Sequence, residues 1–190
     1  MIQSTYILPH WNYFLAIERD MDILSRYIEF NAGNFNCFSL EIARVLLAAC
    51  AESDVVCKQL CHNVAPTARV ANIHGYQKVI TTSIPKIPTF EVLIPRFGLT
   101  LHPWSDLNAP KDNVPQWWRA YNNIKHHRDS NYSEANLKNV LNAVAGLFVV
   151  TLYYYKAEAE AGTLVAPQFF RADHSHIRGG RTKMDPRYQL

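Results

Sequence analysis

The chain has 190 residues, 48% of them hydrophobic, which is enough to bury one core of the size usual for a single domain. Its formal net charge of +3 is too small to mark a nucleic-acid-binding protein by composition, since such proteins carry a stronger basic bias. The whole excess lies beyond residue 170, where five basic residues stand against two acidic ones: Arg171, Arg178, Arg181, Lys183 and Arg187 against Asp173 and Asp185.

Cysteine usage and hydropathy bear on the compartment. Four cysteines follow no leader with a charged start, an apolar centre and a small-residue cleavage site, so we expect a reducing cytoplasm. The longest apolar run, 143–155, has 13 residues, whereas a membrane span needs about 20. We therefore expect a buried core helix there and no membrane association.

Apolar residues spaced by three and four predict two helices in the first third of the chain. The first covers about 10–30. After the turn residues NAGNFN, Ser39 stands at an N-cap position with Glu41 in the first turn, and a second helix runs to about His62. The stripe of the first helix is Phe14, Ile17, Met21, Leu24 and Ile28.

Three cysteines share one face of the second helix, because spacings of seven and four return to nearly the same direction. They are Cys50, Cys57 and Cys61. Metal ligation would need Cys37 or His62 as a further ligand, and no paired CxxC element is present, so we expect the thiols to pack in the core.

The middle of the chain predicts one short helix followed by extended segments. Residues 72–83 predict a shorter helix, ended by Pro85 and Pro88, which cannot continue a helical ladder. Residues 89–103 then predict a small β-hairpin or two extended arms around PRFG, although Pro95 and Pro103 limit strand pairing.

The last third predicts two more helices. Pro115 suits the first turn of a helix that runs through Arg128. Ser133 is expected to cap a final helix over about 134–160, which has a long apolar stripe. Four tryptophans are expected to anchor the core or an interface: Trp11, Trp104, Trp117 and Trp118.

These elements predict an all-α fold, a four- to five-helix bundle with a small β-hairpin or extended insertion and an irregular tail. We place the bundle at 1–162 and a basic C-terminal tail at 163–190. The tail mixes positive charge with aromatics, which suits contact with a phosphate backbone and bases, an arm around a second subunit, or simple solvation. Those aromatics are Phe169, Phe170 and Tyr188. An HxH pair at His174 and His176 lacks the further ligands that a metal site needs.

The helix over 115–128 carries the chemistry of greatest interest. Spacings of three, four and seven place one polar group on a common face: Arg119, Asn122, Asn123 and His126. Flanking them are Lys125, His127 and Arg128, while Trp118, Tyr121 and Ile124 offer an apolar side for docking. Imidazole exchanges protons near neutral pH and guanidinium forks onto phosphate oxygens, so the combination suits RNA cleavage without a metal or cofactor.

An arginine and a histidine separated by four to six residues, on a helix near the end of a four-helix bundle, resemble the HEPN superfamily. Here Arg119 and His126 enclose AYNNIK. The run YNNIKHHR, followed by ANLKNVLNAVAGLF, is similar to a group of bacterial HEPN-like proteins. The likeness extends from the first helix to about residue 160 and includes FSLEIARVLLAACAESDVVCKQLC.

The resemblance implies a bundle that dimerises, so that two motifs form one composite RNA-cleaving site. It implies Arg119 and His126 as the catalytic pair and Asn122 or Asn123 as a polar helper. Members of the superfamily occur in toxin–antitoxin pairs, phage defence and RNA processing, so the implied partners are RNA, a second copy and an antitoxin or other defence-system protein.

One departure from the HEPN motif leaves two functions open. Ala120 follows Arg119, where many active members have a polar residue, and another alignment puts His127 and Asn122 in the motif positions and leaves the site degenerate. The first function is a metal-independent endoribonuclease, and the alternative is a non-catalytic dimerisation or partner-binding module.

Two acidic residues lie in the middle of the second helix. Glu52 is a candidate partner for Arg119, Lys125 or a histidine. The alternative is that Glu52 and Asp54 form a solvated acidic face.

Overall fold

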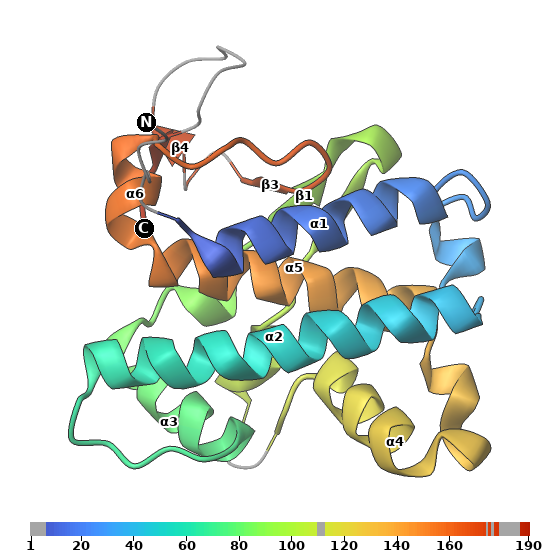
Figure 1. Ribbon diagram of the computed structural model, residues 1–190, viewed down its shortest axis with the longest axis horizontal. Coiled ribbons are helices and arrows are strands. Elements are labelled where there is room, and N and C mark those ends of the chain that lie inside the picture. Colours follow the sequence, from blue (N-terminus) through green and yellow to red (C-terminus); the bar gives the residue numbers. More distant parts are fainter. Residues whose placement is uncertain (1–6, 110–112, 174, 176, 179–186) are drawn as a thin grey trace, which may run out of the picture.

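Three long helices lie side by side at the centre of the fold: α1 (Pro9–Leu24), α2 (Leu40–Val64) and α5 (Leu137–Tyr154) (Figure 1). They are seen in a computed structural model that describes residues 7–109, 113–173, 175, 177–178 and 187–190. The described part of the chain is mostly helical and carries a small antiparallel sheet. The predicted predominance of helix, with a minor β insertion, is confirmed.

Two shorter helices cover the side of α2 that faces away from α1 (Figure 1). They are α3 (Ile73–Ser83) and α4 (Gln116–Asn131). Helix α4 also packs on α5, so α2, α4 and α5 share one core. A last short helix, α6 (Lys156–Ala161), follows α5 after the backbone departs from helical geometry at Tyr155.

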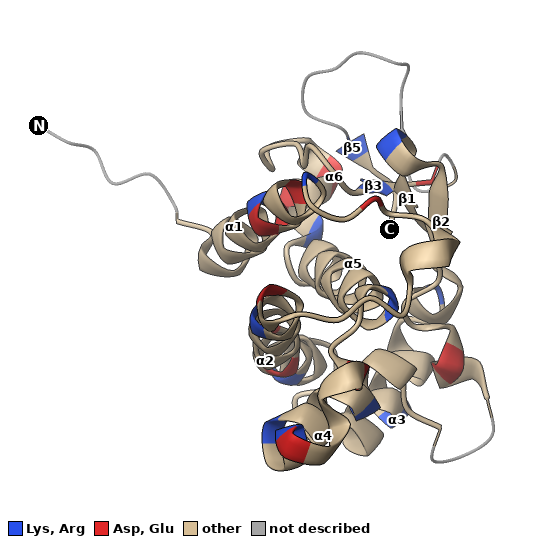
Figure 2. Ribbon diagram, turned by 90° about the vertical axis from the view of Figure 1, so that its right-hand side faces the viewer, with Lys and Arg blue, Asp and Glu red and all other residues tan. Residues whose placement is uncertain are grey.

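Helix α5 is the core helix. Figure 2 shows it enclosed by other elements and almost free of charge, and Lys138 is its one charged residue. It is long and apolar enough to cross a membrane, yet 83% of it is buried inside the fold. The predicted burial of the apolar run 143–155 is confirmed, because neighbouring elements cover this helix on all sides.

All four tryptophans are buried, which confirms their predicted role as core anchors. Three of them also use the indole N–H, which needs a partner once it is removed from water. Trp11 donates to the Val165 carbonyl at 3.0 Å. Trp104 and Trp117 donate to the carbonyls of Gly146 and Pro103 at 3.0 and 2.7 Å.

The β insertion is a hairpin with a third strand from the tail. Strands β1 (Val92–Ile94) and β2 (Leu99–Leu101) pair antiparallel, and Gly98, with φ of +62°, closes the turn between them. Left-handed backbone of this kind favours glycine because a β-carbon would clash. Strand β3 (Arg171–Ala172) pairs with the other edge of β1, which the sequence pattern did not predict.

The described part of the tail packs on the body of the protein. Phe169 and Phe170 are buried, as is Tyr188 in the short strand β5 (Arg187–Tyr188), which pairs with β4 (Ile177–Arg178). Of the three alternatives for the tail, stacking of these aromatics on bases does not fit the structure, because their rings lie inside the core. The tail histidines His174 and His176 lie outside the described residues.

Several predicted helix ends need correction. Helix α1 ends at Leu24 rather than near residue 30, since the Ser25 hydroxyl bonds the Asp22 carbonyl at 2.6 Å and the chain turns there. Ser39 caps α2 as predicted. Helix α5 is capped by Asn136, whose side chain accepts from the Asn139 N–H at 3.0 Å, and not by Ser133.

Candidate functional site

Helix α4 docks through an apolar stripe and leaves a polar face in solvent. Trp118, Tyr121 and Ile124 are buried against the core, as their spacing predicted. The exposed side carries all the predicted site residues except Asn123: Arg119, Asn122, Lys125, His126, His127 and Arg128. Docking by one stripe therefore fixes which polar side chains reach solvent.

Arg119 and His126 share a face of α4. The backbone is helical from Gln116 to His126, so the seven-residue spacing spans nearly two full turns, about 10 Å along the axis. The guanidinium of Arg119 is turned toward the start of the helix, where Nη2 donates to Asn113 Oδ1 at 2.7 Å and to the Val114 carbonyl at 3.3 Å. Within one chain the two groups are therefore apart.

The helix is interrupted at His127. Its φ and ψ of −144° and 48° are not helical, and its carbonyl accepts from the side chains of Asn131 at 3.0 Å and Ser130 at 3.4 Å. A spacing of five residues separates two helical side chains by about 140°, so Asn122 and His127 do not share a face in the way that Arg119 and His126 do. The geometry favours His126 as the partner of Arg119 on this face.

Asn123 and Lys125 are held by neighbours within the chain. Asn123 Nδ2 donates to both carboxylate oxygens of Glu134, at 3.1 and 3.0 Å. Lys125 Nζ lies 5.5 Å from the centroid of the Tyr121 ring, a cation–π contact that leaves its charge in solvent. Asn122, which is exposed, is therefore the better candidate for a polar helper than Asn123.

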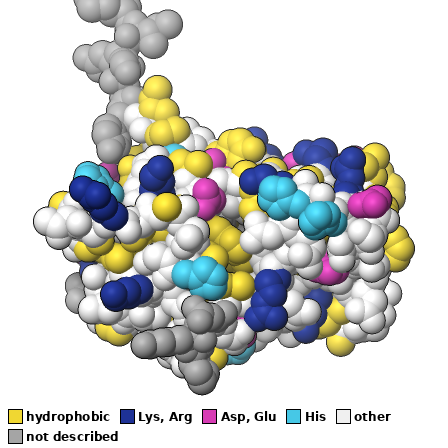
Figure 3. Space-filling model, turned by 90° about the horizontal axis from the view of Figure 1, so that it is seen from below, with side chains coloured by type: hydrophobic (Ala, Val, Ile, Leu, Met, Phe, Trp, Pro, Cys, Tyr) yellow, Lys and Arg dark blue, Asp and Glu magenta, His cyan; other side chains and the backbone are white. Residues whose placement is uncertain are grey.

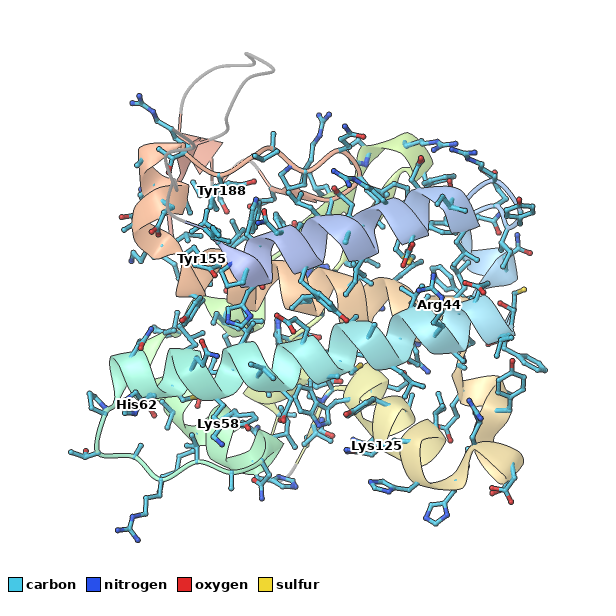
Figure 4. The ribbon with its side chains drawn as sticks, viewed as in Figure 1. Arg44, Lys58, His62, Lys125, Tyr155 and Tyr188 are labelled. Carbon is cyan, nitrogen blue, oxygen red and sulfur yellow. The ribbon has the colours of Figure 1, made fainter. Side chains whose placement is uncertain are left out.

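The face that carries α3 and α4 is basic. Together these two helices contain four lysines and arginines, one acidic residue, Asp129, and three exposed histidines. Figure 3 shows lysine, arginine and histidine side chains distributed over this face, with fewer acidic ones. Lys58 and His62 of α2 project to the same side as Lys125 (Figure 4). The near-neutral composition of the body thus conceals an uneven distribution of charge.

Asp54 of α2 lies at the edge of this face and is already engaged. Its carboxylate forms a hydrogen bond with the hydroxyl of Tyr76 on α3. Burial, followed by the nearby Asp54 charge, raises the pKa of Tyr76 well above its ordinary value, so the phenol stays protonated and donates. This bond attaches α3 to α2 beside the basic surface.

The cysteines of α2 are packed in the core, as predicted. Cys50, Cys57 and Cys61 are fully buried, and burial raises the pKa of Cys61 to about 11. A neutral thiol is a poor metal ligand and a poor nucleophile. Within the described residues, no group of three or more His, Cys, Asp or Glu side chains is arranged to hold a metal.

A cluster around His10 was not recognised from the sequence. His10 Nδ1 lies 2.5 Å from Glu52 Oε1, and His10 Nε2 lies 3.2 Å from Gln59 Oε1. The Tyr155 hydroxyl accepts from the backbone N–H of His10 at 3.4 Å. Glu52 therefore pairs with a histidine of α1 and not with Arg119 or Lys125 of α4. The seven-residue spacing of Glu52 and Gln59 was the available signal, because it places both on one face of α2.

Comparison of the chain with protein-family models, curated proteins and solved structures gave no match. The fold and site define a mostly helical protein with a cationic, histidine-bearing surface helix. Its function is therefore inferred from the geometry of α4 and the charge around it.

Proposed function

We propose that this chain is a HEPN-like helical bundle that acts in the cytoplasm as a homodimer and cleaves RNA without a metal. The observation that supports this most strongly is the exposure of Arg119 and His126 on one face of α4, with regular helix between them. The surrounding α3–α4 face is basic, which favours a polyanion.

The proposed reaction is a transesterification. His126 removes the proton from a ribose 2′-hydroxyl, and the oxygen attacks the adjacent phosphorus. The bond to the 5′-oxygen breaks, and this oxygen takes a proton from a second histidine. The products carry a 2′,3′-cyclic phosphate and a 5′-hydroxyl. Arg119 stabilises the charge that develops on the non-bridging oxygens.

The separation of Arg119 and His126 along the helix is the reason for proposing a dimer. About 10 Å of helix divides their backbones, and the guanidinium is directed at Asn113, so one α4 does not place both groups on a single phosphate. Two copies that meet at α4 would bring the Arg119 of one chain toward the His126 of the other. Asn122 and Lys125 would then position the RNA backbone.

A second function is a non-catalytic module that holds a partner protein, such as an antitoxin or another defence-system protein. The hydrogen bonds from Arg119 to Asn113 and Val114 favour it, because an arginine fixed in this way supports the start of α4. Under this function the polar face contacts protein, and no bond in RNA is broken.

Cleavage of a mixed RNA pool in EDTA decides between the two functions. The samples are wild type, Arg119→Ala, His126→Ala and a control, His102→Ala, which replaces an exposed histidine outside α4. Products that end in a 2′,3′-cyclic phosphate, formed only by wild type and the control, support the nuclease. RNA left intact by wild type rejects the nuclease and leaves the binding module.

A further inference from the structure

A groove of about 320 Å³ is lined by residues of α1, of the turn after β1 and of the segment 165–171. Helix α1 lies on the opposite side of the protein from α4 (Figure 1). Three arginines from distant parts of the sequence line it: Arg19 of α1, Arg96 of the turn after β1, and Arg171 of β3. Its volume is at the lower end of the range for small-molecule sites, which begins at about 300 Å³. The groove is thus large enough for a small anionic ligand.

Two anchors fix the wall formed by residues 165–171. Trp11 donates its indole N–H to the Val165 carbonyl at 3.0 Å. The Glu18 carboxylate accepts the backbone N–H groups of Gln168, Phe169 and Phe170 at 3.1, 2.7 and 3.0 Å. A wall held at both ends is already formed before a ligand arrives, which lowers the entropy cost of binding.

The charges of the groove leave two cations available. Asp22 neutralises Arg96 through an ion pair of 2.8 Å. Glu18 also lines the groove, but its side chain is mostly buried and its carboxylate oxygens accept main-chain N–H groups. Arg19 and Arg171 are exposed, and neither takes part in an ion pair within the described residues.

The apolar side of the groove is also incompletely covered. Val165 is 63% exposed, which is high for a large hydrophobic side chain on a segment that the structure holds in place. Leu15 and Phe169 continue this apolar lining. A ligand that carried only charge would leave these carbon atoms in water, whereas one with an apolar or aromatic body would cover them.

We infer that this groove binds a small phosphate monoester, with the phosphate between Arg19 and Arg171 and the organic body against Val165. Guanidinium groups donate paired hydrogen bonds to phosphate oxygens, and a monoester phosphate offers three such oxygens. The site is separate from α4, so it does not depend on RNA cleavage.

Calorimetric titration of the full chain tests this inference with adenosine 5′-monophosphate, adenosine and inorganic phosphate as probes. The monophosphate should bind with a dissociation constant below about 1 mM, and the other two at least about tenfold more weakly. Arg19→Gln and Arg171→Gln should each weaken its binding about tenfold, since each removes a charged hydrogen-bond donor.

Two control variants separate this site from general charge effects. Arg26→Gln, at an exposed arginine just after α1 and outside the groove, should leave binding unchanged. Arg119→Ala tests whether the nucleotide binds at α4 instead of in the groove, because Arg119 lies on that helix. Melting temperatures establish that each variant is folded, as expected for exposed positions.

Three results would overturn the inference. One is the absence of saturable binding by the monophosphate. Another is equal weakening in Arg26→Gln, which would mean non-specific attraction. The third is loss of binding in Arg119→Ala with retention in Arg171→Gln, which would assign the nucleotide to the α4 face.

Discussion

Gly146 of α5 lies so close to Trp117 of α4 that a β-carbon added to Gly146 would be 2.8 Å from Cζ2 of the indole. The same glycine accepts a hydrogen bond from Trp104 through its carbonyl, and the two indole rings meet edge to face with centroids 5.0 Å apart. This contact fixes how closely α4 approaches the core helix. It therefore sets the position of the helix that carries Arg119 and His126.

Gly146→Ala should destabilise the protein. Alanine improves helix propensity by up to about 1 kcal/mol, but the methyl group overlaps a buried indole and should cost about 1–3 kcal/mol. We expect the free energy of unfolding to fall by about 1–2 kcal/mol in urea denaturation. Gly75→Ala in α3 is the matched control, because its β-carbon would meet only ordinary contacts of 3.4 Å, and it should be neutral or stabilising. Equal effects at both glycines would contradict the role of the close approach.

The caps of α5 give a second prediction. Asn136→Ala should lower the free energy of unfolding by about 1 kcal/mol, since it removes the acceptor for the Asn139 N–H. Ser133→Ala should change it by less than about 0.5 kcal/mol, because the Ser133 side chain is exposed and does not cap the helix. Urea denaturation of both variants measures the difference. The reverse order of effects would place the cap at Ser133.

Glu18 gives a prediction about pH. Burial raises the pKa of its carboxyl above the ordinary value, although hydrogen bonds from the main chain of 168–170 act in the opposite direction. The folded state therefore takes up the proton more readily than the unfolded state, and this contribution to stability is lost as pH rises through the folded-state pKa.

The measurement compares wild type with Glu18→Gln, which does not titrate. Between about pH 4 and pH 7, the wild type should lose free energy of unfolding relative to the variant. Glu29→Gln, at an exposed position, serves as the control. The difference in free energy of unfolding between wild type and Glu18→Gln could instead stay constant, or grow in favour of wild type, as pH rises. Either result would show that the hydrogen bonds dominate over burial.

The hydrogen bond between His10 and Glu52 should couple α1 to α2. A double-mutant cycle with His10→Ala and Glu52→Ala should give a coupling energy of about 1 kcal/mol, because both side chains are mostly buried and lie 2.5 Å apart. The surface pair of Arg96 and Asp22 is the comparison, since exposure weakens its interaction. Additive effects at His10 and Glu52 would mean that the contact contributes no net stability.

Binding of RNA should depend on the basic face around α4. Lys125→Gln and Lys58→Gln should each reduce the slope of binding against salt concentration by about one, as expected for loss of one phosphate contact. Lys156→Gln in α6, which lies on the opposite side of α2 from α4 (Figure 1), should leave the slope unchanged. Fluorescence anisotropy at several salt concentrations measures the slopes. An unchanged slope in the α2 and α4 variants would place RNA elsewhere or exclude it.

Much of the secondary structure was predictable from the order of the residues. Apolar spacing placed α2, α3 and the docking side of α4, and Ser39 marked the start of α2. These features arise from contacts between residues three or four apart, so they leave a local pattern. The exposure of His126 follows from the same pattern, because it lies opposite the apolar stripe.

The candidate site was predictable only in part. The residue types and their spacing on α4 were visible, but the kink at His127 and the turn of Arg119 toward Asn113 were not. The kink is accompanied by side-chain hydrogen bonds to the His127 carbonyl, which compete with the regular helix. Arg119 bonds residues that precede the helix. The apolar spacing of the sequence predicts neither contact.

The sequence by itself determined where the main helices lie, though not all of their ends, together with the apolar faces that they bury and the residue types that reach solvent on α4. Only the tertiary structure decided that the tail is bound by Glu18, through a contact with Phe169 that spans 151 residues, and that Arg19, Arg96 and Arg171 line one groove. Contacts within a helix recur every three or four residues, so they leave a periodic pattern in the sequence. Contacts between distant segments form only when the core is assembled, and they leave no periodic pattern.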